Sequence, residues 1–185
     1  MHKLPFEFAA VRSSGEKCTF TVRCCVPEDL EEIVGLQDKV SASIAQKDLF
    51  VMTKKEEFLE SLKIDYCICA DCGGIMTAFS LMVLPRDSYR NYGTYLDYSK
   101  ERMASCVSFD TTFVLPDFRG FRLQKLFFDL REEYAREIGA GEELSTISPD
   151  NSYSLSNARA SGFETVMTHT IYHGLDRCIM RKIIS

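Results

Sequence analysis

Residues 114–138 read VLPDFRGFRLQKLFFDLREEYAREI, a stretch that joins a strand end, a glycine turn and a long amphipathic helix. Apolar side chains recur at spacings of three and four, which predicts an apolar helix face made of Leu123, Leu126, Phe127, Leu130, Tyr134 and Ile138. The charged side chains are expected on the other faces: Lys125, Asp129, Arg131, Glu132 and Arg136. Pro116 and Gly120 place the first turn near residues 119–124. Unpaired N–H groups and the helix dipole there predict an anion site.

Two motifs in this order resemble the GNAT acyltransferases, whose phosphate loop reads Gln/Arg-x-x-Gly-x-Gly/Ala at a strand-to-helix junction. Here the loop window is RGFRLQ, residues 119–124. Arg119 fits the first position, whereas Arg122 stands where the pattern has Gly and Gln124 where it has Gly or Ala. The second motif, NSYSLSNARASGF at 151–163, is similar to the family's later helix, which begins with Asn and closes on Gly-Phe.

The order of predicted elements, β-α-α-β-β-β-α-β-α-β-β, has α+β character. The GNAT resemblance covers roughly residues 18–182, and it implies a seven-stranded mixed sheet, splayed between its fourth and fifth strands and flanked by about four helices. It also implies that acetyl-CoA binds in that opening and donates its acyl group to an amine. The length of 185 residues predicts a single domain, in which residues 1–16 form a tail or an edge segment.

Several elements follow from local patterns. Strands are expected at 18–25, 65–71, 75–84, 106–115, 144–148, 164–172 and 177–184. Helices are expected from Pro27, at 53–63, from the first turn near 119–124 to Ile138, and at 151–161. Cys72-Gly73-Gly74 predicts a hairpin turn between two of these strands.

The resemblance implies which residues hold the donor. Its phosphates are expected on backbone N–H groups of Arg119, Gly120, Phe121, Arg122, Leu123 and Gln124. The Arg122 side chain either hinders close approach or adds a guanidinium partner for a phosphate. Main-chain groups of Thr112, Phe113 and Val114 are expected to hold the acyl carbonyl and the pantetheine arm. Asn151 is expected to contact CoA, to cap its helix, or both.

Asp110 is the candidate general base, because it lies in the apolar run VSFDTTFV, four residues before Val114. Apolar neighbours would raise the pKa of its carboxyl group toward neutrality. The alternative is that Asp110 pairs with Arg119 or another cation and only shapes the cleft. In the family a tyrosine, seven residues after the helix-leading Asn, usually protonates the leaving thiolate, but that position is Ala158 here. Tyr153 and Tyr172 are the substitute candidates.

The segment 86–103 carries tyrosines at positions 89, 92, 95 and 98, and its polarity predicts that it lies outside the core. One interpretation is a substrate lid that, with the helices within 28–63, selects a cationic amine by cation–π contact. The other is that the tyrosines pack on the protein's own surface or form a dimer contact.

Composition narrows the classes of partner. The net charge of −5 and the pI near 5.3 argue against a general nucleic-acid-binding protein. No run approaches the ~20 apolar residues of a membrane span, and the first residues lack a signal-peptide core, so we expect a cytoplasmic protein. Cys67, Cys69 and Cys72 lack a second ligand pair with zinc-site spacing, so no metal is expected and the eight cysteines are expected to be reduced.

The leading functional hypothesis is therefore an N-acyltransferase that acts on a small-molecule or peptide amine. The alternatives are a non-catalytic acyl-CoA-binding module and a scaffold protein with a decayed site. The acceptor, the acyl-chain preference and the oligomeric state, including a homodimer, stay open.

Overall fold

A computed structural model describes residues 3–172 and 174–184. Within these residues the strands are β1 Phe6–Val11, β2 Lys17–Cys24, β3 Tyr66–Cys72, β4 Ile75–Val83, β5 Cys106–Val114, β6 Glu142–Ile147, β7 Glu164–Ile171 and β8 Leu175–Ile183. The α-helices are α1 Leu30–Ser43, α2 Lys55–Ile64, α3 Lys100–Met103, α4 Leu123–Glu137 and α5 Ser152–Ala160. Short 3₁₀ helices are η1 Pro27–Asp29, η2 Lys47–Leu49, η3 Tyr92–Leu96 and η4 Pro116–Phe118.

These strands form one mixed sheet in the order β1-β2-β3-β4-β5-β6-β8-β7. The predicted α+β class is confirmed, and four of the described helices have seven or more residues. The sheet has one strand more than the seven that the resemblance implies. The additional strand is β1, in the segment for which a tail or an edge segment was predicted, and it forms one edge of the sheet. No described helix has the length and hydropathy that a membrane span requires.

The chain divides into two compact units. The first comprises the chain up to Ala45, Met52–Leu81 and Thr111–Leu130, and the second comprises Gln46–Val51, Met82–Asp110 and the chain from Arg131 onward. Strands β4 and β5 and helix α4 each contribute residues to both units. The prediction of a single domain stays a prediction.

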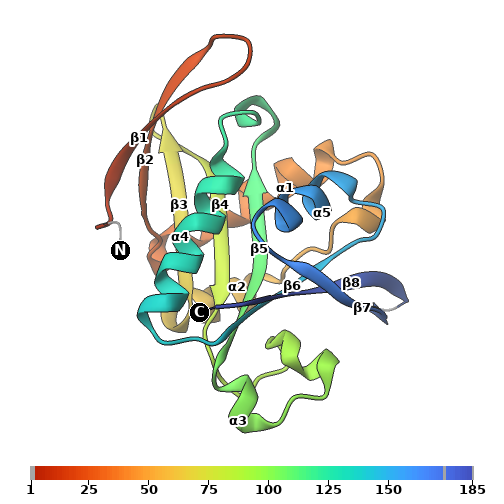
Figure 1. Ribbon diagram of the computed structural model, residues 1–185. Coiled ribbons are helices and arrows are strands. Elements are labelled where there is room, and N and C mark those ends of the chain that lie inside the picture. The colour runs from red at the N-terminus through yellow and green to blue at the C-terminus, as the bar shows by residue number, and fades with distance from the viewer. Residues whose placement is uncertain (1–2, 173, 185) are drawn as a thin grey trace. The chain divides into compact units, whose positions relative to one another are not determined.

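In the first unit, β1 and β2 form an antiparallel hairpin, and β3 lies beside β2 (Figure 1). Gly73 and Gly74 connect β3 to β4 with φ values of 61° and 80°, as the predicted two-residue turn requires. Phe58 of α2 packs edge-on against Phe79 of β4, with ring centroids 5.7 Å apart. Residues 123–130, the first half of α4, also belong to this unit.

In the second unit, β5 runs parallel to β6, from Cys106 opposite Glu142 to Phe109 opposite Ser145. Strand β6 then pairs antiparallel with β8, and β8 pairs with β7 in the blue hairpin of Figure 1. Strands β5 and β6 correspond to the fourth and fifth strands of the seven predicted from sequence. Their splay stays a prediction.

Candidate active site

The turn before α4, where an anion site is predicted, contains two residues in an uncommon backbone conformation. Gly120 and Arg122 have φ values of 88° and 62°, so both lie in the left-handed region. Helix α4 begins at Leu123, and the N–H of Leu126 donates to the main-chain oxygen of Arg122 at 3.0 Å, so the helical hydrogen bonds start at this turn. In an α-helix the N–H groups of the first turn point out of the helix end. Arg122 thus adopts the left-handed conformation at the position where the resembling motif has glycine, at a cost of roughly 1–2 kcal/mol.

Side chains from distant parts of the first unit hold this turn. The ring of Phe121 is 1% exposed and packs edge-on against Phe20 of β2, with centroids 5.5 Å apart. Arg12, just after β1, lies over the Phe121 ring at 5.1 Å and donates to the main-chain oxygen of Asp117 at 3.0 Å. Arg119 reaches the hydroxyl of Ser43 at the end of α1 at 3.3 Å. Phe121 is therefore an anchor of the turn, and Arg12 is a component that the sequence did not reveal.

The end of β5 is buried through alternate side chains. Phe113 is 1% exposed and stacks on Phe79 with centroids 5.9 Å apart. Thr112, on the other face, shares a 3.1 Å hydrogen bond with the hydroxyl of Ser80. These contacts fix the backbone of Thr112, Phe113 and Val114. The role predicted for their main-chain groups toward the donor stays a prediction.

Asp110, in the second unit, is held by two polar side chains. Arg90 donates to its Oδ2 at 2.6 Å, and the hydroxyl of Tyr92 donates to its Oδ1 at 3.1 Å. The side chains of Arg90 and Asp110 are 6% and 17% exposed. Asp110 therefore has the cation partner that the alternative interpretation allowed, and this cation is Arg90. Its role as a base stays a prediction.

The tyrosine-rich segment is packed on its own unit. Tyr92 is 5% exposed, so the expectation that it lies outside the core is wrong. Asn91, which is fully buried, donates to the main-chain oxygens of Arg86 and Met103, and this fixes the segment. The hydroxyl of Tyr98 donates to Glu142 at 2.9 Å. The polarity of the segment misled the prediction, because its buried polar groups satisfy one another.

Two further ionisable side chains, Arg131 and Glu143, are buried in the second unit. Arg131 was expected on the polar face of α4, but it is 2% exposed and lies over the ring of Phe109 at 4.0 Å. Burial lowers the pKa of Arg131 to about 9, while the charges of Glu143 and Asp110 oppose this change. Glu143 is fully buried, and burial raises the pKa of its carboxyl group to about 7.

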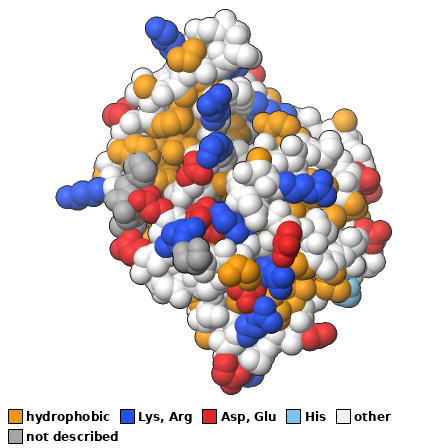
Figure 2. Space-filling model, in the orientation of Figure 1, with side chains coloured by type: hydrophobic (Ala, Val, Ile, Leu, Met, Phe, Trp, Pro, Cys, Tyr) orange, Lys and Arg blue, Asp and Glu red, His pale blue; other side chains and the backbone are white. Residues whose placement is uncertain are grey.

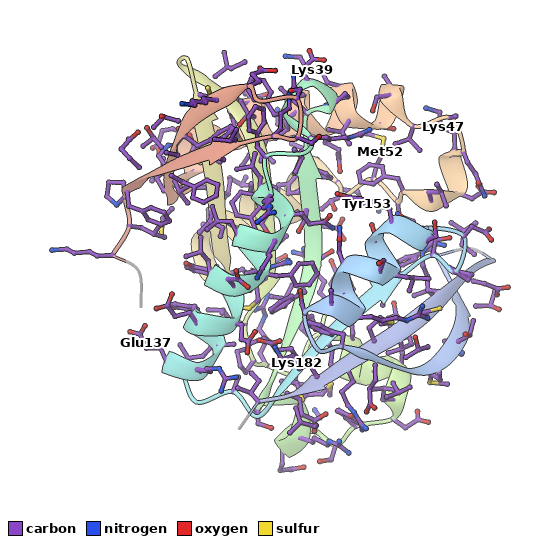
Figure 3. The ribbon with its side chains drawn as sticks, turned by 45° about the horizontal axis from the view of Figure 1, so that its top comes forward. Lys39, Lys47, Met52, Glu137, Tyr153 and Lys182 are labelled. Atoms are coloured by element: carbon purple, nitrogen blue, oxygen red, sulfur yellow. The ribbon has the colours of Figure 1, made fainter. Side chains whose placement is uncertain are left out.

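Helix α5 begins as the second motif predicts. The Oδ1 atom of Asn151 accepts a 3.0 Å hydrogen bond from the N–H of Ser154, so Asn151 is the N-cap. Ala158 is fully buried, whereas Tyr153 is 69% exposed and projects away from α5 (Figure 3). The predicted contact of Asn151 with CoA and the predicted role of Tyr153 as an acid stay predictions.

No protein-family model matches the sequence. The search of curated proteins also gave no match. Solved structures do match the fold. A GNAT-family acetyltransferase from Streptococcus pneumoniae superimposes with a TM-score of 0.69 over 90% of this chain and 99% of its own, at 15% sequence identity. The fold is GNAT-like.

Two further structural neighbours were solved with acetyl-CoA or with coenzyme A. A putative acetyltransferase from Salmonella typhimurium, solved with its cofactor acetyl-CoA, has a TM-score of 0.68 at 14% identity and covers 90% of this chain and 94% of its own. The PaiA N-acetyltransferase from Thermoplasma acidophilum, in complex with coenzyme A, has a TM-score of 0.63 at 14% identity over 89% and 99% of the two chains. Identities this low establish the fold alone.

Proposed function

We propose that this protein is an N-acyltransferase that moves an acetyl or related acyl group from acetyl-CoA to the amine of a small molecule or peptide. The observation that carries the proposal is the turn at 119–124, which precedes α4 in a GNAT-like fold with Gly120 and Arg122 in the left-handed region. Such a turn directs backbone N–H groups and the positive end of a helix dipole at a phosphate.

The acceptor must lose a proton in this reaction. A lysine-like amine has a pKa near 10.4, so only roughly one molecule in a few thousand is neutral at pH 7. We assign Asp110 as the group that takes this proton, directly or through water. Arg90 and Tyr92 orient its carboxylate, because each holds one of its two oxygens. Main-chain groups near Val114 polarise the thioester carbonyl.

The leaving thiolate needs no dedicated acid in this proposal. Coenzyme A leaves as a thiolate whose conjugate acid has a pKa near 8.5, so a water molecule suffices as the proton source. Ala158, at the usual tyrosine position, supports the second candidate function, a non-catalytic module that binds acyl-CoA. This module would bind acetyl-CoA and release no thiol with any amine.

Thermal unfolding with and without acetyl-CoA tests the donor site. A ligand at about a hundred times its dissociation constant stabilises the folded state by roughly 2.7 kcal/mol, so the unfolding temperature is expected to rise measurably. Free adenosine at the same concentration is the control, because it lacks the pyrophosphate. No rise at millimolar acetyl-CoA would contradict both candidate functions and leave the scaffold hypothesis.

The partner predictions belong to the same proposal. The face in Figure 2 shows Lys and Arg side chains interspersed with Asp and Glu, a pattern that suits a small charged acceptor better than a phosphate backbone. We propose neither a nucleic-acid partner nor a membrane partner. A cytoplasmic location and a homodimer stay predictions from the sequence.

A further inference from the structure

A series of hydroxyl groups leads away from Asp110 within the second unit. The buried Tyr92 hydroxyl contacts Oδ1 of Asp110 at 3.1 Å, and it also hydrogen-bonds with the hydroxyl of Tyr172. The Tyr172 hydroxyl lies 3.3 Å from the hydroxyl of Thr146 on β6. Tyr95 stacks on Tyr92 with centroids 6.1 Å apart and hydrogen-bonds with Tyr172. The network therefore connects Asp110 to the turn that follows β7.

The backbone at Tyr172 is held in an uncommon conformation. Its φ is 50°, in the left-handed region, which costs a residue other than glycine roughly 1–2 kcal/mol. Strain of this kind persists where the surroundings fix it, and it concentrates at functional sites. In this backbone conformation the Tyr172 ring lies under the guanidinium of Arg177, whose central carbon is 5.7 Å from the ring centroid. The Tyr172 hydroxyl then lies 3.3 Å from the Thr146 hydroxyl.

The two partners of Asp110 differ in what they can do with a proton. The guanidinium of Arg90 has no acceptor lone pair, so it orients the carboxylate and cannot receive a proton from it. The phenol of Tyr92 is both a donor and an acceptor. A proton on Oδ1 therefore has a path through Tyr92.

We propose that Tyr92 and Tyr172 relay to solvent the proton that Asp110 takes from the acceptor amine. The amine N–H bond breaks as an O–H bond forms on Oδ1 of Asp110. Tyr92 takes this proton while its own proton passes to Tyr172, and Tyr172 gives up its hydroxyl proton to water. Each hydroxyl takes up one proton and passes on another, so the net change is one proton moved from the amine to water; no electron is transferred, and Asp110 returns to its carboxylate form. This inference rests on the proposed acyltransferase function.

The electrostatic environment keeps the relay neutral between turnovers. Burial raises the pKa of the Tyr92 and Tyr172 hydroxyls, and the charge of Asp110 adds to this effect for both residues. Burial also raises the pKa of Tyr95, to about 12. The phenols therefore stay protonated near neutral pH and pass protons by coupled transfer, without a phenolate intermediate.

Thiol release from acetyl-CoA, with spermidine, lysine amide and an alanine-leading peptide as acceptors, tests the relay. Tyr172→Phe keeps the ring and removes the hydroxyl, so it is expected to lower kcat by roughly tenfold to a hundredfold, within the range of proton-transfer effects, with the acetyl-CoA KM unchanged. Imidazole in the buffer is expected to restore part of the rate, because a small base can carry the proton. Tyr92→Phe is expected to lower kcat by a similar factor, and imidazole is expected to restore part of its rate as well.

Tyr98→Phe is the matched control, since its hydroxyl binds Glu142 in the same unit and lies outside the network that the described residues form around Asp110. It should keep the wild-type kcat. A wild-type kcat in both Tyr172→Phe and Tyr92→Phe would overturn the relay, as would a lowered kcat that imidazole does not raise. A wild-type protein that releases no thiol would instead overturn the proposed function, which separates the two failures.

Discussion

Arg90 donates a 2.6 Å hydrogen bond to Oδ2 of Asp110, and both side chains are largely buried although the two residues are 20 positions apart. A buried ion pair of this kind is costly to break from one side, because the remaining charge loses its partner. The pair therefore couples the stability of the second unit to the orientation of the candidate base.

We predict strong coupling between these two positions. Arg90→Met should lower the free energy of unfolding by about 3 kcal/mol, because the Asp110 carboxylate is left without its guanidinium. Arg90→Met combined with Asp110→Asn should recover most of this loss. Urea unfolding of the wild type, both single variants and the double variant gives the coupling energy. Additive effects would show that the pair contributes nothing beyond its two separate side chains.

Arg122→Gly should stabilise the protein by about 0.5–1 kcal/mol, because glycine adopts a φ of 62° without the steric cost that arginine pays. The matched control is Arg119→Gly, which should destabilise, since Arg119 has a φ of −69°. Titration calorimetry with acetyl-CoA should give nearly unchanged affinity for Arg122→Gly if backbone N–H groups bind the phosphates. A large loss of affinity would assign the binding to the Arg122 guanidinium.

Glu143 should make the protein less stable as pH rises from about 4.5 to about 7. Its folded-state pKa is raised from 4.5 to about 7, first by burial and second by the charge of Glu132, so the folded state binds more protons than the unfolded state in this window. The difference between the two pKa values corresponds to about 3 kcal/mol of folding stability, and this contribution is fully lost above the folded-state pKa. Lys182, Arg131 and Arg136 oppose the effect. Lys182, labelled in Figure 3, also pairs with Glu132 at 2.6 Å.

The variant that tests this is Glu143→Gln. It should raise the free energy of unfolding by about 1–3 kcal/mol at about pH 8 and change it little at about pH 5. The lower end of this range allows for the loss of the electrostatic attraction between Arg131 and the ionised Glu143 carboxylate. Urea unfolding at both pH values is the measurement. A variant less stable than the wild type at the higher pH would show that an ionised Glu143 stabilises Arg131.

Cys18 and Cys72 should form a disulfide under oxidising conditions. Their Sγ atoms lie 2.7 Å apart across β2 and β3, and both are free thiols that are partly exposed. Oxidised glutathione should take up the two electrons, and the protein should lose two hydrogens and gain up to about 4 kcal/mol of stability. Burial raises the pKa of Cys18 to about 11, so the reaction should accelerate as pH rises. The prediction would be contradicted if peptide mapping found disulfides between other cysteines and none between Cys18 and Cys72. It would also be contradicted if Cys72→Ser lost as many free thiols on oxidation as the wild type.

Local signals predicted the elements well, because each depends on neighbouring residues. A turn is specified by the backbone conformation of Gly73 and Gly74, which have positive φ values. Another turn, before α4, is specified in the same way by Pro116 and Gly120. The contacts that complete the site could not be predicted in this way. Arg12 reaches Asp117 across 105 positions, and nothing in its own surroundings marks it.

Burial of polar residues was the second source of error. Arg131 follows the helical period of a polar face, yet the ring of Phe109 and the charge of Glu143 accommodate it inside. Tyr92 lies in a polar run, but Asp110, Tyr172 and the hydroxyl of Ser108 satisfy its polar groups. Pattern rules assign such residues to the surface because the partners that satisfy them come from other strands.

The decisive measurement is thiol release from acetyl-CoA by the wild type and by Asp110→Asn, with the acetyl-CoA affinity of both proteins measured alongside. The wild type should release coenzyme A with at least one of the three amines named above. Asp110→Asn should turn over roughly 10²- to 10⁴-fold more slowly with the same acetyl-CoA affinity. Equal turnover would remove Asp110 from the mechanism, and acetyl-CoA binding without thiol release for any amine would contradict the acyltransferase function itself.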